Sequence, residues 1–383
     1  MESELLWAGE LARLNEMGNL RTLPDVEHDG RWIHAEGRTM LNLSSNDYLG
    51  LSSETGLRQA FFDSLSGEDA LLSSSSSRLL TGNYSVYTRL EHLLAEYFEK
   101  EAALTFSSGY HMNAGILPAI ADARTLILAD KLVHASLIDG IRLSAARCIR
   151  YRHQDYQQLE MLLAKHHRDF ERIVIVTESI FSMDGDIAPL SRLVELKKHY
   201  PGAMLYVDEA HAIGVRGRKG LGIAEEQGCI RDIDFLCGTF GKALASVGAY
   251  VVCSRTVRDY LVNRMRTFIF TTALPPLNVA WTCWVMERLP DMDARRQHLT
   301  VLSEHLREGL RQKGYACPSG SHIAPMIVGS SHDAVVKAEQ MQRHGFYILP
   351  VRPPTVPENT SRLRFSLTAG MTLPELEQLI NAL

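Results

Sequence analysis

The sequence contains no long hydrophobic run and no cysteine pair at the spacing of a metal site. Within its 383 residues, no stretch approaches the ~20 consecutive apolar residues that span a bilayer, so no transmembrane helix is predicted. The six cysteines form no C-x-x-C pair and lie mostly in apolar runs. This pattern is typical of buried free thiols in a reducing compartment. It argues against a disulfide scaffold or a zinc ribbon, and no metal site is predicted.

The chain also lacks a strong excess of charge of either sign. Its 40 lysines and arginines and its 45 aspartates and glutamates give a net charge of -5. Such a balance creates no field that would attract nucleic acid or an acidic lipid surface, so neither partner is expected. Glutamates interrupt the apolar positions of the segment 1–20, which predicts an amphipathic helix and argues against a secretory signal. We therefore expect a soluble cytoplasmic protein.

Helical and strand periodicities alternate from about residue 84. An apolar stripe marks a helix over 86–97, and further helical segments include 159–165 and 190–199. Short apolar runs, most of them separated by such helices, follow at 102–106, 125–129, 173–177, 203–207, 235–237 and 250–253. Short apolar strands spaced by helices predict an α/β fold with a largely parallel sheet that is covered on both faces.

The pattern changes after about residue 290, where a smaller α+β domain is predicted. Its expected elements are helices at 294–313 and 334–343 and strands at 323–328, 347–351 and 362–367. Near the N-terminus, the segment 30–43 is predicted to form a hairpin, and the serine run 73–77 is interpreted as a possible flexible linker. A usual domain size of ~150 residues allows two or three units. We expect an N-terminal segment (1–50), a large domain (51–289) and a small C-terminal domain (290–383).

The tetrapeptide Asp208–His211 follows one of the predicted strands, at the place where sheets of this kind bind ligands. It spells an acidic motif of helicase-type ATPases. Such an ATPase also needs a phosphate loop of the form G-x-x-x-x-G-K-[ST]. The nearest candidate, 238–243, has the wrong glycine spacing and places Ala243 where a hydroxyl is required. The sequence therefore disfavours an ATPase.

Asp208, His211 and Lys242 fit a single cofactor instead. Lys242 lies in a turn of small residues, where an ammonium would be partly desolvated, as a lysine that forms a Schiff base requires. A carboxylate at Asp208 could keep a pyridine nitrogen protonated, and His211 could reach the phenolic oxygen of the ring. Each residue also has an ordinary interpretation, such as a solvated lysine or a helix-capping aspartate. Together, after consecutive strands, they predict a site for pyridoxal 5'-phosphate (PLP).

Earlier segments offer a phosphate cradle and a ring stack. Residues 107–113 follow a predicted strand and open a helix, whose free amides can bind an anion. Tyr110 or His134 could lie on the ring, although a histidine in this position could equally be a partner of the helix start. Ser182 lies just beyond the predicted strand 173–177.

A series of motifs runs in order along nearly the whole chain, at 44–50, 76–79, 108–110, 134–136, 182–186, 208–211, 239–242 and 362–364. Together they resemble the α-oxoamine synthases, a family of fold-type-I PLP-dependent enzymes. The resemblance implies a PLP-dependent acyltransferase. It also implies a large domain with a mainly parallel, seven-stranded type of sheet covered by helices, and a small α+β C-terminal domain.

The resemblance implies roles for residues around the cofactor. Lys242 would bind PLP covalently and then move protons at the substrate Cα. Asp208 would contact the ring nitrogen and His211 the ring oxygen, and His134 would stack on the ring. Gly109, Tyr110 and Thr239 would help to hold the phosphate. Thr271 or Thr272 would reach the phosphate of the partner subunit in a homodimer.

The resemblance also implies a substrate side of the site. Arg364 would bind the carboxylate of the amino acid, a task that suits a guanidinium. Arg21 and Thr355 match positions that contact the acyl substrate, and Asn46 and Ser182 match positions that line the site. The run 352–357 resembles the branch that joins L-alanine to a pimeloyl thioester, of coenzyme A or of acyl carrier protein, in biotin biosynthesis.

Three points stay open in the sequence. Two alternatives to this assignment remain: a relative that uses glycine or serine in place of alanine, and a non-catalytic protein with the same fold. The acyl group could arrive on coenzyme A or on a carrier protein. Finally, the serine run 73–77 replaces a glycine-rich loop of the family, which reduces backbone freedom at positive φ and leaves the local loop geometry open.

Overall fold

The computed structural model describes residues 2–383, which divide into two compact units. Unit 1 contains the described residues up to Glu54, the short segment Ser182–Asp186, and Gln297–Leu383. Unit 2 contains Thr55–Phe181 and Ile187–Arg296. No pattern in the sequence indicates that the five-residue segment Ser182–Asp186, from the middle of the chain, joins unit 1. The expected domain boundaries near residues 50 and 290 stay a prediction.

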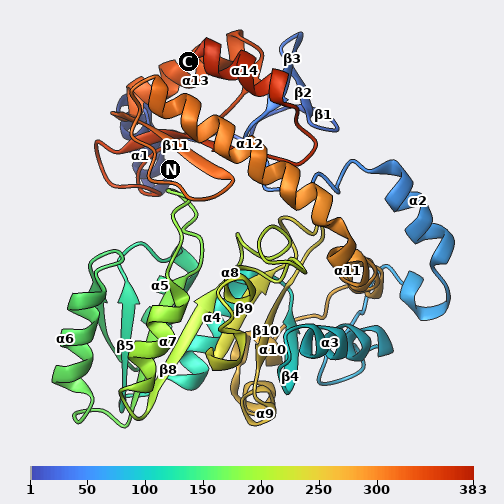
Figure 1. Ribbon diagram of the computed structural model, residues 1–383, viewed down its shortest axis with the longest axis vertical. Helices are drawn as coiled ribbons and strands as arrows, with labels where there is room; N and C mark the ends of the chain where they lie inside the picture. The colour runs from blue at the N-terminus through green and yellow to red at the C-terminus, as the bar shows by residue number, and fades with distance from the viewer. Residues whose placement is uncertain (1) are drawn as a thin grey trace. The chain divides into compact units, whose positions relative to one another are not determined.

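Unit 2 is built on a seven-stranded sheet with the order β4-β10-β9-β8-β7-β5-β6 (Figure 1). The strands in that order are β4 (Ala102–Phe106), β10 (Ala249–Cys253), β9 (Phe235–Thr239), β8 (Ala203–Asp208), β7 (Arg172–Glu178), β5 (Thr125–Asp130) and β6 (Arg147–Tyr151). Strand β10 pairs antiparallel with β4 and β9, and all other pairings in this sheet are parallel. The predicted α/β fold with a mainly parallel sheet is therefore confirmed.

Helices accompany the sheet of unit 2 along the chain. They are α2 (Thr55–Ser64), α3 (Ser85–Tyr97), α4 (Gly109–Ile120), α5 (Ala135–Leu143), α6 (Tyr156–His166), α7 (Leu190–Lys198), α8 (Ile223–Glu226), α9 (Arg255–Arg264), α10 (Arg266–Ile269) and α11 (Pro276–Arg288). Every residue of β4, β5, β9 and β10 is buried. Burial on both faces explains why these strands are continuous apolar runs in the sequence.

Strand β6 was missing from the predicted elements. Its sequence, Arg147-Cys148-Ile149-Arg150-Tyr151, mixes charged and apolar residues, and only Tyr151 is buried. The strand pairs with β5 alone and forms one edge of the sheet. An edge strand that is partly exposed carries too weak an apolar signal to be recognised from sequence.

Unit 1 holds two small sheets, three whole helices and most of a fourth. One sheet has the order β1 (Glu27–Asp29), β2 (Trp32–Ala35), β3 (Arg38–Asn42) and β12 (Phe346–Tyr347). The other has the order β11 (Ile323–Gly329), β14 (Ser361–Ser366) and β13 (Pro350–Val351). The helices are α1 (Glu2–Glu16), α13 (Ser331–Arg343) and α14 (Leu373–Ala382), with most of α12 (Asp293–Gln312).

Two predicted elements of unit 1 have different outcomes. The hairpin at 30–43 is confirmed, because β2 and β3 pair antiparallel through Glu36 and Gly37, whose φ angles are 51° and 72°. The single strand predicted at 347–351 is wrong. Its residues divide into β12, which pairs with β3, and β13, which pairs with β14, so one apolar run serves two sheets.

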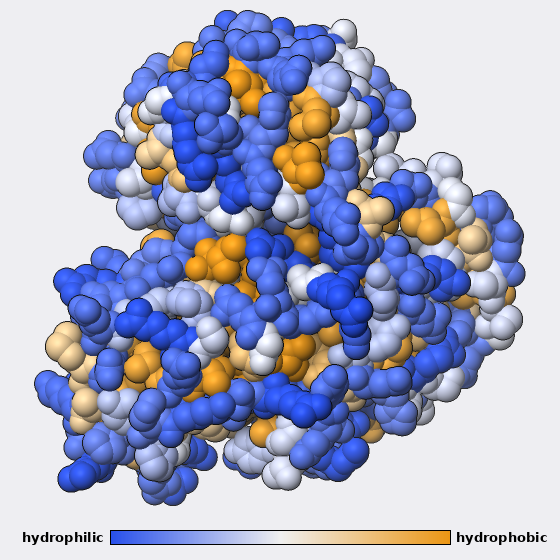
Figure 2. Space-filling view, in the orientation of Figure 1, coloured by the Kyte–Doolittle hydropathy of each residue, from blue (hydrophilic) through white to orange (hydrophobic). Residues whose placement is uncertain are grey.

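The surface carries scattered apolar residues. The predicted N-terminal helix is present as α1, and its Leu5, Leu6 and Trp7 are 72%, 75% and 68% exposed. Figure 2 shows a face that is mainly hydrophilic, with hydrophobic residues in separate patches. Within residues 2–383, none of the helices combines the length and the apolar character needed to cross a membrane.

Candidate functional site

Polar residues follow neighbouring strands of unit 2 at their carboxyl ends. Glu178, Asp208 and Thr239 are the last residues of β7, β8 and β9. In the parallel register, Asp208 lies opposite Glu178 on one side and Cys237 on the other. Because the carboxyl ends of parallel strands meet at one edge of a sheet, this edge is where a ligand site is expected.

Lys242 and His211 come together at this edge. Lys242 lies three residues after the end of β9, and His211 lies three residues after the end of β8. Nζ of Lys242 lies 2.9 Å from Nε2 of His211. Lys242 is half-buried and His211 is buried. The structure therefore brings together an amine and an imidazole that the sequence separates by 31 positions.

Asp208 is held by two hydrogen bonds. Its carboxylate is buried, with the residue 6% exposed. Oδ1 accepts the backbone N–H of Ala210 at 2.8 Å, and Oδ2 accepts the Nδ2–H of Asn113 at 2.8 Å. These donors fix the orientation of the carboxylate and leave it lone pairs for a protonated ring nitrogen.

His134 is the N-cap residue of α5, and its side chain is exposed. Its Nδ1 lies 2.8 Å from Oγ of Ser136 and accepts the backbone N–H of Ser136 at 3.2 Å. Its own backbone N–H donates to the buried carboxylate of Glu178 at 2.5 Å. Desolvation by the neighbouring protein atoms lowers the pKa of His134, although part of the side chain stays exposed; the Asp208 charge opposes that shift, and the Lys242 charge adds to it.

The beginning of α4 offers an anion site. Ser108 caps the helix, and its Oγ accepts the N–H of His111 at 3.2 Å, so the first N–H groups of the helix remain for a ligand. A Cβ on Gly109 would lie 3.8 Å from the side chain of Thr239, so the two residues are adjacent. Thr239 donates from Oγ1 to the carbonyl of Gly248 at 2.9 Å. These are groups that can hold a phosphate.

Tyr110 lies in the first turn of α4 and is 50% exposed. Its hydroxyl donates to Oδ2 of Asp139 at 2.5 Å, which raises the pKa of the phenol. The phenol therefore keeps its proton at neutral pH and bonds a neighbouring side chain on α5.

Thr271 and Thr272 lie in the segment between α10 and α11, and not at the end of a strand of the sheet. They line a small pocket together with Arg78, Ser107 and Phe268. Oγ1 of Thr271 donates to the carbonyl of Thr272 at 3.5 Å. Their proposed contact with a partner subunit's phosphate stays a prediction.

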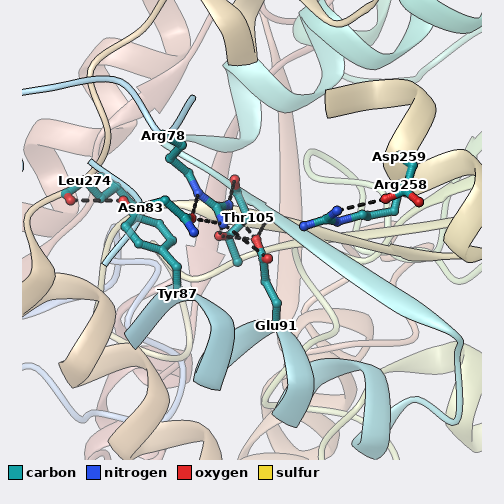
Figure 3. A network of polar contacts seen from close by, with 8 residues as sticks. All are labelled: Arg78, Asn83, Tyr87, Glu91, Thr105, Arg258, Asp259 and Leu274. Atoms are coloured by element: carbon teal, nitrogen blue, oxygen red, sulfur yellow. Dashed lines mark hydrogen bonds and ion pairs between the residues drawn. The ribbon is translucent and has the colours of Figure 1, made fainter. Parts of the chain in front are cut away.

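Arg78, from the serine-arginine motif, is buried in a polar network beside β4 (Figure 3). Its guanidinium binds both carboxylate oxygens of Glu91, at 2.5 and 3.2 Å, and lies 4.2 Å above the ring of Tyr87. Glu91 also accepts the N–H and the hydroxyl of Thr105 at 2.8 and 2.9 Å. The network joins the loop before α3 to the end of β4, directly before the segment that opens α4.

We expect Glu91→Ala to lower the free energy of unfolding by about 3–5 kcal/mol, because the buried Arg78 would lose its counter-charge. Urea unfolding followed by circular dichroism measures the change. Glu99→Ala is the matched control, since Glu99 pairs with Arg231 on the surface and such pairs contribute about 1 kcal/mol or less. Equal losses in the two variants would contradict the assigned role of the buried pair.

The serine run 73–77 is not a free linker, so this interpretation was wrong. Ser74 is buried and donates from Oγ to the carbonyl of Leu274 at 2.6 Å. The N–H of Ala273 donates to the carbonyl of Ser76 at 3.0 Å. Ser75 takes the left-handed backbone conformation, with φ of 47°, at a point where a glycine would be unstrained. The run is thus fixed against the segment that carries Thr271 and Thr272.

In unit 1, Arg364 on β14 is surrounded by neutral oxygens. Nε donates to the carbonyl of Ser182 at 2.5 Å, and Nη1 donates to Oγ of Ser366 at 2.6 Å. Weaker bonds reach Oδ1 of Asn46 at 3.4 Å and the hydroxyl of Tyr48 at 3.3 Å. The structure thus groups Arg364 with Asn46 and Ser182. Neutral acceptors orient the guanidinium without cancelling its charge, so it can still bind a carboxylate.

Arg362 lies two residues earlier on the same strand and, in contrast to Arg364, bonds a charged acceptor. It is buried and forms an ion pair with Asp184 at 2.5 Å. Its charge is therefore already compensated inside unit 1. The comparison favours Arg364, and not Arg362, as the group for a substrate carboxylate.

Arg21 and Thr355 lie near one another in unit 1. Nη2 of Arg21 donates to the carbonyl of Pro353 at 2.9 Å, within the loop that carries Thr355. Nη2 of Arg352 donates back to the carbonyl of Leu20 at 3.2 Å. Arg21 and Thr355 are both exposed, so both side chains are accessible to a ligand.

Residues beneath the site were not assigned roles from the sequence. Asn113, Ser136 and Glu178 are 2%, 1% and 3% exposed and contact Asp208 or His134. Burial raises the pKa of Glu178 well above its usual value, and the nearby Asp208 charge adds to this. Asn113 lies in the predicted phosphate cradle 107–113 and Ser136 in the motif 134–136, but neither pattern shows which side chains face one another.

Comparisons with known proteins agree on one family. The model of the family "Aminotransferase class I and II" matches residues 38–383. A Pasteurella multocida protein named "Putative 8-amino-7-oxononanoate synthase" is 58% identical over 375 residues, which are 98% of this chain and 97% of that protein.

Two solved structures share the fold. One is a serine palmitoyltransferase of S. paucimobilis with bound PLP-myriocin aldimine, with a TM-score of 0.90 and 27% identity, covering 98% of this chain and 95% of that one. The other is 8-amino-7-oxononanoate synthase from Francisella tularensis, with a TM-score of 0.76 and 28% identity, covering 90% and 96%. On these findings, and on the fold-type-I architecture described above, the chain belongs to the α-oxoamine synthases, PLP-dependent acyltransferases within the aminotransferase class I and II family.

Proposed function

We propose that this chain condenses L-alanine with a pimeloyl thioester to give 8-amino-7-oxononanoate, a step of biotin biosynthesis. The observation that carries the proposal is the amine of Lys242 at 2.9 Å from His211, beside the buried carboxylate of Asp208. The run 352–357 and the name of the Pasteurella multocida relative support this branch of the family.

The proposed reaction balances in bonds and protons. The Cα–H bond of alanine breaks, a bond forms between Cα and the acyl carbon, and the carbon–sulfur bond of the thioester breaks. The sulfur leaves as the thiol, with a proton that balances the one lost from Cα. The bond from Cα to the alanine carboxylate then breaks, carbon dioxide leaves, and a proton returns to Cα.

Different residues of the chain would have different roles in this reaction. PLP, when bound, supplies an electron sink for negative charge at Cα. Nζ of Lys242 would take the proton from Cα and later return one, since a free amine is a competent base. Asp208 would keep the ring nitrogen protonated, and His211 would orient the ring oxygen. The first N–H groups of α4 with Thr239 would hold the phosphate.

Arg364 would bind the carboxylate of alanine. We expect Arg364→Lys to raise KM for alanine by about tenfold or more, because an ammonium cannot reproduce the two parallel hydrogen bonds of a guanidinium. Steady-state kinetics with varied alanine measures the change. Arg311→Lys is the control, since Arg311 is an exposed residue of α12. An unchanged KM in Arg364→Lys would contradict the assignment.

The choice of amino acid separates this proposal from its alternatives. Thiol release is measured with L-alanine, glycine and L-serine in turn, each with pimeloyl thioesters of coenzyme A and of acyl carrier protein. The proposal expects the highest kcat/KM with alanine. Preference for glycine or serine would assign the chain to another branch, and thiol release with none of them would favour a non-catalytic protein.

The proposal includes a homodimer in the cytoplasm. The expected contact of Thr271 or Thr272 with a partner subunit's phosphate requires a second copy of the chain. All six cysteines are free thiols, which suits a reducing compartment. Analytical ultracentrifugation of the PLP-loaded protein tests the dimer.

A further inference from the structure

A chain of buried polar side chains lies beneath the cofactor residues of unit 2. Its members are Asn113 on α4, Ser136 on α5 and Tyr206 on β8, which are 2%, 1% and 0% exposed. Tyr206 stands two positions before Asp208 on the same strand, so both side chains point to the same face of the sheet. Asn113 was described above as a donor to Asp208 and Ser136 as a contact of His134, but the link between these two contacts, and Tyr206, were not.

The amide of Asn113 can have only one orientation here. The Tyr206 hydroxyl donates to Oδ1 of Asn113 at 2.6 Å, and Nδ2 of Asn113 faces Oδ2 of Asp208 at 2.8 Å and Oγ of Ser136 at 2.9 Å. Burial raises the pKa of Tyr206, so the phenol keeps the proton that it donates. A flipped amide would turn its oxygen toward the carboxylate, which also only accepts. The two amide hydrogens therefore go to Asp208 and Ser136.

The hydrogen-bond donation that starts at Asn113 continues through Ser136 to His134. Because Ser136 Oγ accepts from Asn113, its own hydrogen is available to Nδ1 of His134 at 2.8 Å. The backbone N–H of Ser136 points to the same nitrogen at 3.2 Å. With two donors aimed at Nδ1, the single proton of a neutral ring must sit on Nε2.

The charges around His134 are of both signs. Desolvation by neighbouring atoms opposes a second proton on the ring, as does the charge of Lys242, whereas Asp208 and Asp139 favour it, and their sum lowers the pKa of His134. The carboxylate of Glu178 accepts the backbone N–H of His134. A neutral imidazole is what stacking on a protonated pyridine ring requires, because a second positive charge would oppose the first.

We propose that Asn113 is a positioning residue that sets the proton positions on both sides of the cofactor: it orients Asp208 as an acceptor and, through Ser136, holds His134 as the neutral Nε2–H tautomer. The proposal rests on the proposed roles of Asp208 and His134. The proton positions can nevertheless be measured without substrates, so a failed condensation assay would leave this proposal standing.

The first test reads the tautomer directly. Imidazole-labelled protein is examined by 15N NMR with and without PLP, and His134→Gln identifies the signal. We expect a bare Nδ1 and a protonated Nε2 in the parent protein. Ser136→Ala should raise the pH midpoint of His134 by about one unit, because the neutral ring loses a donor at Nδ1. Thr39→Ala is the matched control, since Thr39 makes a 2.9 Å contact to Nδ1 of the partly exposed His34 in unit 1.

The second test reads Asn113 in the PLP-loaded protein, by pH titration of the visible absorbance of the cofactor. Asn113→Ala should move the midpoint of this absorbance change upward by about one to two pH units. Without the Nδ2–H of Asn113, the Asp208 carboxylate is no longer oriented toward the ring nitrogen, which then loses its proton more readily. A ring without that positive charge lets the nitrogen that joins PLP to Lys242 hold its own proton to higher pH. Tyr206→Phe should move it in the same direction by less, and Thr39→Ala should not move it. If Asn113→Ala fails to fold, Tyr206→Phe and Ser136→Ala decide. A proton on Nδ1 of His134, or midpoints unchanged in these variants, would overturn the proposal.

Discussion

Lys242→Ala is expected to lower turnover by about 10⁴-fold or more, because the variant loses both the amine that binds PLP and the base at Cα. The residue lies 2.9 Å from His211, in the turn after β9. Borohydride treatment of the PLP-loaded parent protein should fix the cofactor to Nζ of Lys242, and mass spectrometry of peptides should locate it there.

A matched lysine makes this test specific. Lys131 is exposed in the same unit, directly after β5, and Lys131→Ala should keep both turnover and the fixed cofactor. Lys242→Ala should lose the fixed cofactor while its circular dichroism stays unchanged. Retained turnover in Lys242→Ala, or a cofactor fixed to another lysine, would remove Lys242 from its assigned role.

Asp208→Asn is expected to lower turnover by about 10²- to 10³-fold, the size of effect found when one preorganised electrostatic group is removed from an active site. An amide of the same shape still accepts the N–H of Ala210, but it has no charge to keep a ring nitrogen protonated. The measurement is kcat with saturating alanine, together with the visible spectrum of bound PLP.

The control for Asp208 is Asp232→Asn. Asp232 forms a partly exposed ion pair with Lys198 in the same unit, so its loss should leave kcat unchanged. If Asp208→Asn stayed within about threefold of the parent protein, charge at this position would not assist the reaction, and the assignment of Asp208 would be wrong.

The sheet of unit 2 could be predicted from the sequence because its strands are buried on both faces. β4, β5, β9 and β10 are continuous apolar runs for this reason. Strand β6 could not be predicted, because an edge strand with Arg147 and Arg150 has only weak apolar character. The run at 347–351 carried the signal of a strand, but it is divided between two sheets by tertiary pairing that no local pattern encodes.

The site could be predicted only in part, and for a related reason. Asp208, His211 and Lys242 follow strands, and the rule that ligands lie at the carboxyl ends brings them together. Asn113 and Tyr206 lie 93 positions apart in the sequence yet share a hydrogen bond of 2.6 Å. Such contacts depend on how α4 packs beside β8, which motifs do not describe. The resemblance pointed to Arg364 already, and the ion pair of Arg362 with Asp184 supplies a physical reason for that choice which the sequence does not contain.

The most direct test of the central claim follows the carboxyl carbon of alanine through the reaction. The PLP-loaded protein is incubated with a pimeloyl thioester and with L-alanine labelled at C1 or, separately, at C3, and the gas and the product are analysed by mass spectrometry. The account predicts that the C1 label leaves as carbon dioxide, and that the C3 label is retained in 8-amino-7-oxononanoate. A product that keeps the C1 label, or thiol release without any product that contains the alanine methyl carbon, would contradict it.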